Sequence, residues 1–326
     1  MIVPDHWAEA RCQHRAAGKQ VTIRRYGWSE LSEIDAQAKA QARADDALQR
    51  VLAGEKLIRR EPKLAYNGAD GVPIREEVLA RHGEHVITRN AYGAHCLNSP
   101  NALFADIDFT TEKSATSVFL TFAVLAALTI PVGTYYKSWG VSLTLLLVSL
   151  VVAGSMAELV IRLIAKARGG QERTAQRRLA DFVAQNPTWG IRVYRTPAGL
   201  RLLVTHQTFE ATSTEVQRFF KAVSADPMYI RMCTNQRCFR ARLTAKPWRI
   251  GIAAHMRPRP GIWPVRAQHM AVRNAWIANY ETKAADFAAC RFIGSLGSGI
   301  VHASIAPVID LHDSASGALA DSMPLA

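Results

Sequence analysis

The sequence lacks the motifs that most often identify a nucleotide-binding or zinc-dependent protein. Its 326 residues contain no GxxxxGKS/T phosphate loop, no GxGxxG after an expected strand and no HExxH helix. Residues 1–10 also lack the apolar stretch of a cleavable signal peptide, so none is expected. The missing motifs exclude the commonest classes of nucleotide-binding protein and of zinc protease. Charge and hydropathy are then the informative features of the sequence.

Paired cysteines are missing as well. The five cysteines are odd in number and scattered, and even the closest two, Cys233 and Cys238, do not have a zinc-ligand spacing. A disulfide framework is therefore not expected, and a reduced cytosolic setting fits better.

Charge is absent from two long segments. Residues 115–136 and 138–157 contain no charged side chain and are separated only by Lys137. About 20 apolar residues suffice to cross a hydrocarbon core of about 30 Å. The sequence therefore predicts a transmembrane helical hairpin over residues 115–164. The alternative, two buried helices of a soluble core, is disfavoured because soluble helices rarely continue for five turns without a solvent-facing charge.

Basic residues are distributed unequally around this hairpin. Six follow the second span, whereas its tip, with Tyr135, Tyr136 and Trp139, offers only Lys137. The positive-inside tendency predicts a membrane protein with two transmembrane helices and cytoplasmic N- and C-termini. Residues 1–114 and 165–326 are then expected to be two halves of one cytoplasmic domain. The six basic residues are Arg162, Lys166, Arg168, Arg173, Arg177 and Arg178.

Acidic residues are absent from residues 227–280. The chain carries a net charge of +13, and ten of its basic residues lie in this window. Such a block calls for an anionic partner, namely nucleic acid, a nucleotide triphosphate or the anionic cytoplasmic leaflet. The ten are Arg231, Arg237, Arg240, Arg242, Lys246, Arg249, Arg257, Arg259, Arg266 and Arg273.

The remaining chain alternates strand and helix patterns. We expect an α+β fold, a mixed or antiparallel sheet with flanking helices interrupted by the hairpin. Strands 85–88, 95–98 and 102–109 are expected to be neighbours in one sheet. Other expected strands are 21–23, a hairpin within 56–67, 189–195, 200–206, 237–252 and 300–311. The expected helices are 29–52, 76–82, 171–185, 213–223 and 265–289.

Two aspartates stand out on the strand that precedes the hairpin. Asp106 and Asp108 flank Ile107, so on a strand both carboxylates project from one face. Neighbouring carboxylates repel each other, and a divalent cation relieves that repulsion. The pattern favours a Mg²⁺ or Mn²⁺ half-site that takes its other ligands from phosphate and water. The alternative is a strand end whose acids face water. His312 and Asp313, by contrast, are expected to form a capping or surface pair.

Two later stretches give the chain a wider resemblance. Residues 194–204 form a strand, a turn and a strand with Arg201, and residues 235–243 form an arginine-rich segment. With the aspartate strand before them, they resemble the archaeo-eukaryotic primase superfamily and its primase-polymerase branch. The resemblance implies a primase-like fold with an RRM-like core and metal ligation by Asp106 and Asp108.

The resemblance also assigns roles to other residues. Arg201 occupies the histidine position of the second motif, and His206 is the alternative match. The third acid has no clear match, since Asp226 precedes the arginine stretch and Asp310 lies on the last apolar run. Asp106 and Asp108 are expected to be catalytic. Nucleotide or nucleic acid phosphates are expected to contact Arg201, His206, Arg237, Arg240, Arg242, Lys246 and Arg249.

Two functions follow from these features. The first is a membrane-anchored, primase-polymerase-like protein that binds nucleotide or nucleic acid and transfers a nucleotidyl group with a divalent metal. The second is a non-enzymatic membrane protein whose basic cytoplasmic domain docks on anionic lipid or on a protein partner. The first requires Asp106 and Asp108 for metal-dependent nucleotide binding, and the second does not.

Overall fold

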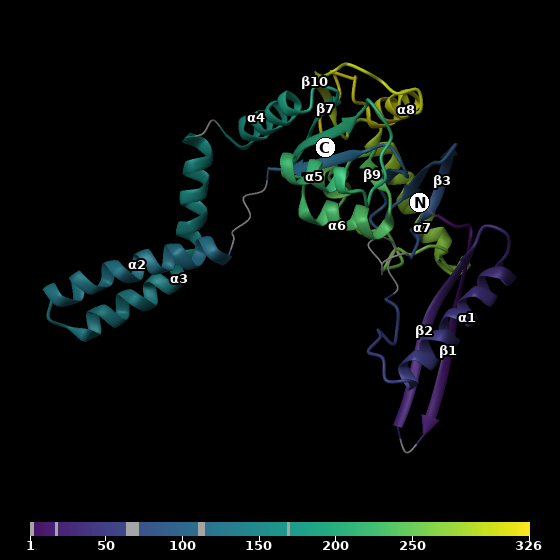
Figure 1. Ribbon diagram of the computed structural model, residues 1–326, viewed down its shortest axis with the longest axis horizontal. Coiled ribbons are helices and arrows are strands. Elements are labelled where there is room, and N and C mark those ends of the chain that lie inside the picture. Colours follow the sequence, from purple (N-terminus) through teal and green to yellow (C-terminus); the bar gives the residue numbers. More distant parts are fainter. Residues whose placement is uncertain (1–2, 17–18, 63–71, 110–114, 168–169) are drawn as a thin grey trace.

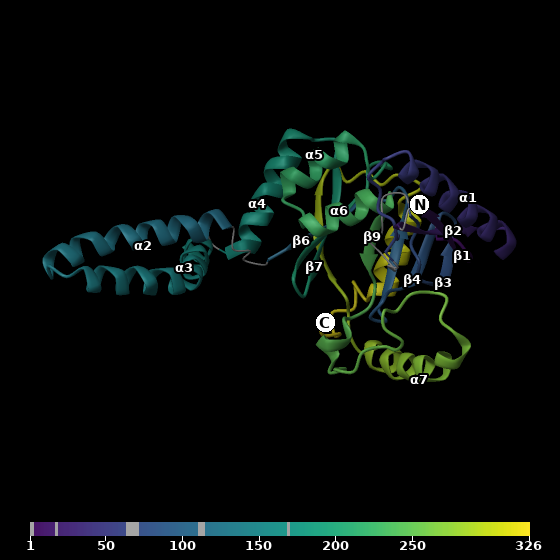
Figure 2. The ribbon, with the colours of Figure 1, turned by 90° about the horizontal axis from the view of Figure 1, so that it is seen from below.

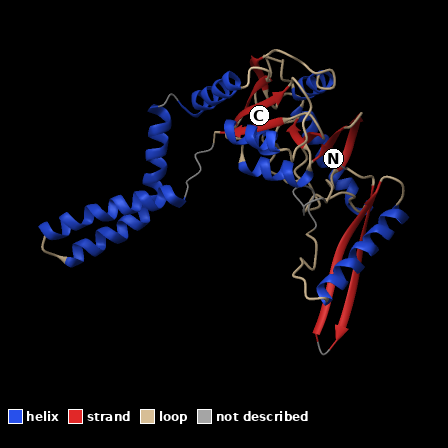
Figure 3. Ribbon diagram, in the orientation of Figure 1, coloured by secondary structure: helices blue, strands red, loops and turns tan. Residues whose placement is uncertain are grey.

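The computed structural model describes residues 3–16, 19–62, 72–109, 115–167 and 170–326. It has a mixed α+β architecture in which the strands are antiparallel and helices flank the sheets. A body of two four-stranded sheets lies between an N-terminal ribbon and a pair of long helices that extend away from it (Figure 1). Figure 3 shows the two long strands of the ribbon apart from the strands of the body, with helices beside both. The expected α+β fold class, with antiparallel sheets and flanking helices, is thus confirmed.

The N-terminal ribbon pairs β1 (His6–Ala16) with β2 (Lys19–Ser29), and α1 (Glu33–Leu52) covers one of its faces. The α1 helix is capped by Ser32, not by Ser29 as expected. Its buried residues are alanines, and Gly27 of β2 lies so close that a Cβ atom there would be 2.2 Å from Ala36 O. The short strand predicted at 21–23 is therefore part of a much longer one. The hairpin predicted within 56–67 falls partly outside the described residues.

The first sheet of the body has the strand order β3-β4-β5-β9. Its strands are β3 (Glu77–His82), β4 (His85–Arg89), β5 (His95–Ser99) and β9 (Phe239–Arg242). The helix predicted at 76–82 was wrong, because this segment pairs with β4 across a tight turn at Gly83. Pairing with a neighbouring strand overrides the weak local preference.

The second sheet has the order β10-β7-β8-β6. Its strands are β6 (Phe104–Asp108), β7 (Gly190–Thr196), β8 (Gly199–Val204) and β10 (Arg291–Gly297). Since β6 and β7 are each antiparallel to β8 between them, they run parallel to each other and form a split β-α-β unit. The β7–β8 hairpin confirms the prediction. The expectation that β6 shares a sheet with β4 and β5 was wrong.

The crossover from β6 to β7 contains the two long apolar helices. It consists of α2 (Ala115–Tyr135), α3 (Trp139–Ala167) and α4 (Gly170–Gln185). The α2 and α3 helices pack on each other and both are long and apolar enough to cross a membrane. Only 6% and 17% of their most apolar windows are buried, so the rest of the described chain does not cover them as it would the core helices of a soluble protein.

Helices enclose the second sheet. The largest buried apolar cluster joins this sheet to α4, α5 (Thr214–Val223), α6 (Pro227–Gln236) and α8 (Ala306–Ser316). Figure 2 shows α4 and α5 side by side over the sheet. The strand predicted at 300–311 was wrong, because Pro307 lies in the first turn of α8 and Val308 and His312 are both buried, one turn apart. The extended segment predicted at 237–252 contains only β9 and the 3₁₀ turn η1 (Pro247–Ile250).

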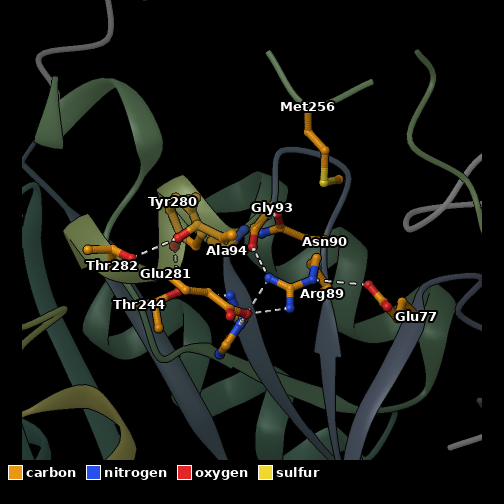
Figure 4. A network of polar contacts seen from close by, with 12 residues as sticks. Glu77, Arg89, Asn90, Gly93, Ala94, Thr244, Met256, Tyr280, Glu281 and Thr282 are labelled. Atoms are coloured by element: carbon orange, nitrogen blue, oxygen red, sulfur yellow. Dashed lines mark hydrogen bonds and ion pairs between the residues drawn. The ribbon is translucent and has the colours of Figure 1, made fainter. Parts of the chain in front are cut away.

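A polar network fixes α7 (Ala267–Ala284) to the first sheet (Figure 4). Arg89 of β4 donates from Nε to Glu77 Oε2 at 3.0 Å and from Nη2 to Glu281 Oε1 at 2.6 Å. Arg273 of α7 donates to the same Glu77 oxygen at 2.5 Å. The helix predicted at 265–289 is confirmed with a later start and an earlier end.

Candidate functional site

A cleft lies where the edge strand β6 of the second sheet meets β9 of the first. It encloses about 200 Å³ and is walled by both sheets, by the β7–β8 turn and by α6. The residues that line it are Tyr92, Cys96, Asp106, Asp108, Thr196, Ala198, Asp226, Tyr229, Met232, Arg240, Arg242 and Lys246.

Asp106, which lines the cleft and is half-buried, forms an ion pair with the buried Arg201. They occupy opposite positions on β6 and β8. Arg201 donates from Nε to Asp106 Oδ1 at 2.8 Å and from Nη2 to Oδ2 at 3.1 Å, and its Nη1 donates to Arg242 O at 2.7 Å. Burial lowers the pKa of Arg201, but the attraction of Asp106 outweighs it and the pKa is raised. Both oxygens of the Asp106 carboxylate are therefore engaged within the protein.

Asp108 and Asp226 form the acidic corner of the cleft. The pKa of Asp108 is raised, first by burial and then by repulsion from Asp106 and Asp226. Asp226 caps α6 by accepting from Tyr229 N at 2.7 Å, and its own backbone N–H donates to Asp106 O at 2.8 Å. The structure thus brings Asp226 to the aspartate strand, which the sequence pattern did not reveal. An N-cap aspartate before a proline is common, so local sequence offered no signal of this role.

Three cations gather near the aspartates: Arg242 and Lys246 line the cleft, and Arg249 lies close to both but does not line it. Burial and repulsion from Arg242 and Arg249 lower the pKa of Lys246. Burial and then Arg242 lower the pKa of Arg249, with Asp108 acting in the opposite direction. Among the residues that the structure describes, Arg242 Nε and Arg249 Nη1 are buried without a hydrogen-bond partner. Buried donors without partners are costly, so this group of cations is suited to an anion that would accept from them.

The other predicted phosphate-binding residues have different surroundings. Arg240 lines the cleft, but it donates to both Glu76 oxygens at 2.9 and 2.7 Å and to Asn98 Oδ1 at 3.0 Å. Arg237 is exposed at the C-terminal end of α6 and does not line the cleft. His206 lies beyond the end of β8 with its ring 4.9 Å from that of Trp189, also away from the cleft.

The remaining candidates lie elsewhere. Asp310 is exposed on α8, so Asp226 is the additional acid near Asp106. His312 and Asp313 are not the expected surface pair. Both are buried, with His312 Nδ1 3.0 Å from Asp313 Oδ1 and Asp313 Oδ2 2.5 Å from Arg192 Nη2. They belong to the contact between α8 and β7.

The predicted Mg²⁺ or Mn²⁺ fits this cleft only in part. Over the described residues, no group of three or more His, Cys, Asp and Glu side chains is placed to hold a metal ion. Arg201 engages the Asp106 carboxylate, which leaves Asp108 and Asp226. Mg²⁺ commonly uses one or two carboxylates together with substrate phosphates and water. The cleft therefore suits a cation that arrives with phosphate, and it does not suit a complete protein cage.

Comparisons with known proteins identified no relative of this chain. No family model, no curated protein and no solved structure matches the chain.

Proposed function

We propose that this protein binds the phosphates of a nucleotide or nucleic acid in the cleft between its two sheets, as a membrane-anchored protein of primase-polymerase type. One observation carries the proposal. Arg242, which lines the cleft, and Arg249, which lies beside it close to Asp108, each have a buried guanidinium nitrogen without a hydrogen-bond partner.

A phosphate chain would satisfy the basic side. The guanidinium groups of Arg242 and Arg249 can donate to phosphate oxygens in the forked geometry that arginine favours. Lys246 adds a third cation. Burial is the larger cause of the lowered pKa values of Lys246 and Arg249, and repulsion from the neighbouring arginines adds to it. An anion between them would remove that repulsion. A neutral ligand would leave the repulsion and the unpartnered donors in place.

A cation would satisfy the acidic side at the same time. Asp108 and Asp226 would hold a divalent ion delivered with the phosphates. When bound, such an ion neutralises charge that develops on a phosphoryl group. Nucleotidyl transfer is the reaction that this arrangement would support. Asp106 has a positioning role, because its pair with Arg201 holds β6 and β8 in register.

The connectivity supports a single domain with an inserted membrane hairpin. β6 precedes α2 and α3, β8 follows them, and the two strands pair directly. Both ends of the hairpin must then reach the same side of a bilayer. We propose that this side is the cytoplasm, because the basic residues follow the second span and only Lys137 lies at the tip.

Binding of a radiolabelled nucleoside triphosphate to the full chain in detergent, with and without Mg²⁺ or Mn²⁺, tests the proposal. The double variant Arg242→Ala/Arg249→Ala is expected to lose binding. Its matched control, Arg231→Ala/Arg237→Ala, removes two exposed arginines outside the cleft and is expected to retain it. Equal losses in both would point to unspecific attraction by the net positive charge.

The same preparations separate the two functions inferred from the sequence. Incorporation of labelled nucleotide onto a primed template would add catalysis to binding. If the wild type binds no triphosphate but sediments with anionic vesicles, and the cleft double variant loses that sedimentation, the basic region is a lipid-docking surface and the proposed function is wrong.

A further inference from the structure

We propose that Trp248 is a stacking platform for a nucleobase at the mouth of the cleft, so that the ligand is a nucleotide and not a bare polyphosphate. This inference rests on the proposed function and identifies the ligand class more closely. It is based on the position of one exposed indole beside the phosphate-binding residues.

Two neighbouring side chains of the 3₁₀ turn η1 differ in their exposure to solvent. Arg249 is half-buried and close enough to Asp108 for that carboxylate to affect its pKa. Trp248, the preceding residue, is 54% exposed. The turn ends at Gly251, whose φ of 74° lies in the left-handed region where glycine is favoured. A short turn that is closed in this way sets the indole beside the cleft and places Arg249 near Asp108.

Two residues that line the cleft also contact this indole. The ring of Tyr92 meets that of Trp248 edge to face, with 5.3 Å between their centroids. The Nζ atom of Lys246 lies 5.4 Å from the Trp248 ring centroid. The indole therefore lies next to the cleft, and Tyr92 and Lys246 pack against it. A ring supported in this way loses little freedom when a base stacks on it.

The size of the cleft supports a ligand that extends beyond it. At about 200 Å³ it is smaller than pockets that enclose a whole drug-sized ligand, which have about 300–1,000 Å³. It has room for phosphates, but a sugar and base would have to lie outside. The indole of Trp248, which is 54% exposed, is an aromatic surface at the rim, and aromatic side chains are the usual platforms for bases.

The test compares ATP with inorganic tripolyphosphate as ligands of the full chain in detergent. Trp248→Ala is expected to weaken ATP binding by about 5- to 150-fold, the range for loss of one stacked base, and to leave tripolyphosphate binding unchanged. Trp248→Phe should retain most of the ATP affinity. Trp139→Ala serves as the control, since it removes a 93% exposed tryptophan from the tip of the α2–α3 hairpin.

The outcomes distinguish the two proposals. If wild type binds neither ligand, the proposed function itself fails. If wild type binds both ligands equally and Trp248→Ala changes neither affinity, the cleft takes polyphosphate and the stacking inference is overturned. If Trp248→Ala weakens ATP and tripolyphosphate alike, the indole supports the fold of η1 and does not contact a base.

Discussion

Two pairs of arginines meet at the cleft and have opposite environments. Arg201 and Arg240 are 1% and 8% exposed, and each forms a two-point ion pair with a carboxylate, Asp106 or Glu76. Arg242 and Arg249 are half-buried, and each has an unpartnered nitrogen. The first pair completes the fold, and the second has donors left for a ligand.

The contrast is sharpest on β9. Arg240 and Arg242 are two residues apart, so they project from the same face of the strand, and both line the cleft. Glu76 accepts from Arg240, whereas Arg242 Nε has no acceptor within the described part of the chain. A single carboxylate from a distant segment thus distinguishes the paired Arg240 from Arg242, whose Nε has no acceptor.

The largest effect is expected from breaking the structural pair. Arg201→Met should lower the free energy of unfolding by about 2–3 kcal/mol, because it leaves the half-buried Asp106 carboxylate without its partner. Chemical denaturation of the full chain in detergent, followed by tryptophan fluorescence, measures this change. The double variant Arg201→Met/Asp106→Leu removes both charges and should recover most of the loss. A single variant as stable as wild type would show that the pair contributes little to the fold.

The second effect is expected on the ligand side. Arg242→Ala should weaken triphosphate binding by about 10- to 100-fold, the effect of losing a hydrogen bond to a charged group, with little change in stability. Its backbone carbonyl remains available to Arg201 Nη1. Equilibrium binding and denaturation of the same preparation separate the two quantities. Arg231→Ala, on the exposed face of α6, is the control. A large loss of stability in Arg242→Ala would place it with the structural arginines.

Features that depend on residues close together in the sequence were predictable. The two apolar helices follow from composition alone, and the β7–β8 hairpin follows from Pro197 and Gly199 in its turn. The position of Gly199 is demanding, since a Cβ atom there would lie 1.9 Å from Ile107 O on β6. The strand that carries Asp106 and Asp108 was predicted for the same local reason.

Features that depend on distant contacts were not predictable. Arg240 and its partner Glu76 are 164 positions apart, so no local pattern distinguishes Arg240 from Arg242. Asp226 reaches the aspartate strand only because the start of α6 packs on β6. The role of Arg201 was also ambiguous, because an arginine on a strand predicts a phosphate contact as readily as an ion pair with the opposite aspartate.

A third, smaller effect concerns the acidic corner and its pH dependence. The folded protein raises the pKa of Asp108 above its ordinary value of 3.8, so it takes up a proton at a higher pH than the unfolded chain. The contribution of Asp108 to stability therefore increases as the pH falls through this raised pKa. Without metal, triphosphate binding should strengthen over the same change because a negative charge is lost. With Mg²⁺ it should weaken, because the proton competes with the cation.

Asp108→Asn makes this expectation measurable. At neutral pH it should bind triphosphate about tenfold more tightly than wild type without metal, and Mg²⁺ should no longer improve its binding. Binding is measured with and without Mg²⁺ at several pH values, and comparison with wild type cancels the titration of the ligand itself. Asp310→Asn, an exposed site on α8, is the control. Unchanged Mg²⁺ dependence in Asp108→Asn would remove this carboxylate from the cation site.

The smallest effect is expected at an arginine outside both pairs. Arg237 ends α6 with a φ of 49°, a left-handed conformation that is unfavourable for a side chain by about 1 kcal/mol. Arg237→Gly should therefore raise the free energy of unfolding by up to about that amount and leave triphosphate affinity unchanged, because the side chain is exposed away from the cleft. Ser224→Gly, at the equivalent position of α5 with a φ of 56°, should give a similar gain. If Arg237→Gly instead weakens binding as much as Arg242→Ala, the ligand extends past the end of α6 and Arg237 belongs with the ligand-binding arginines.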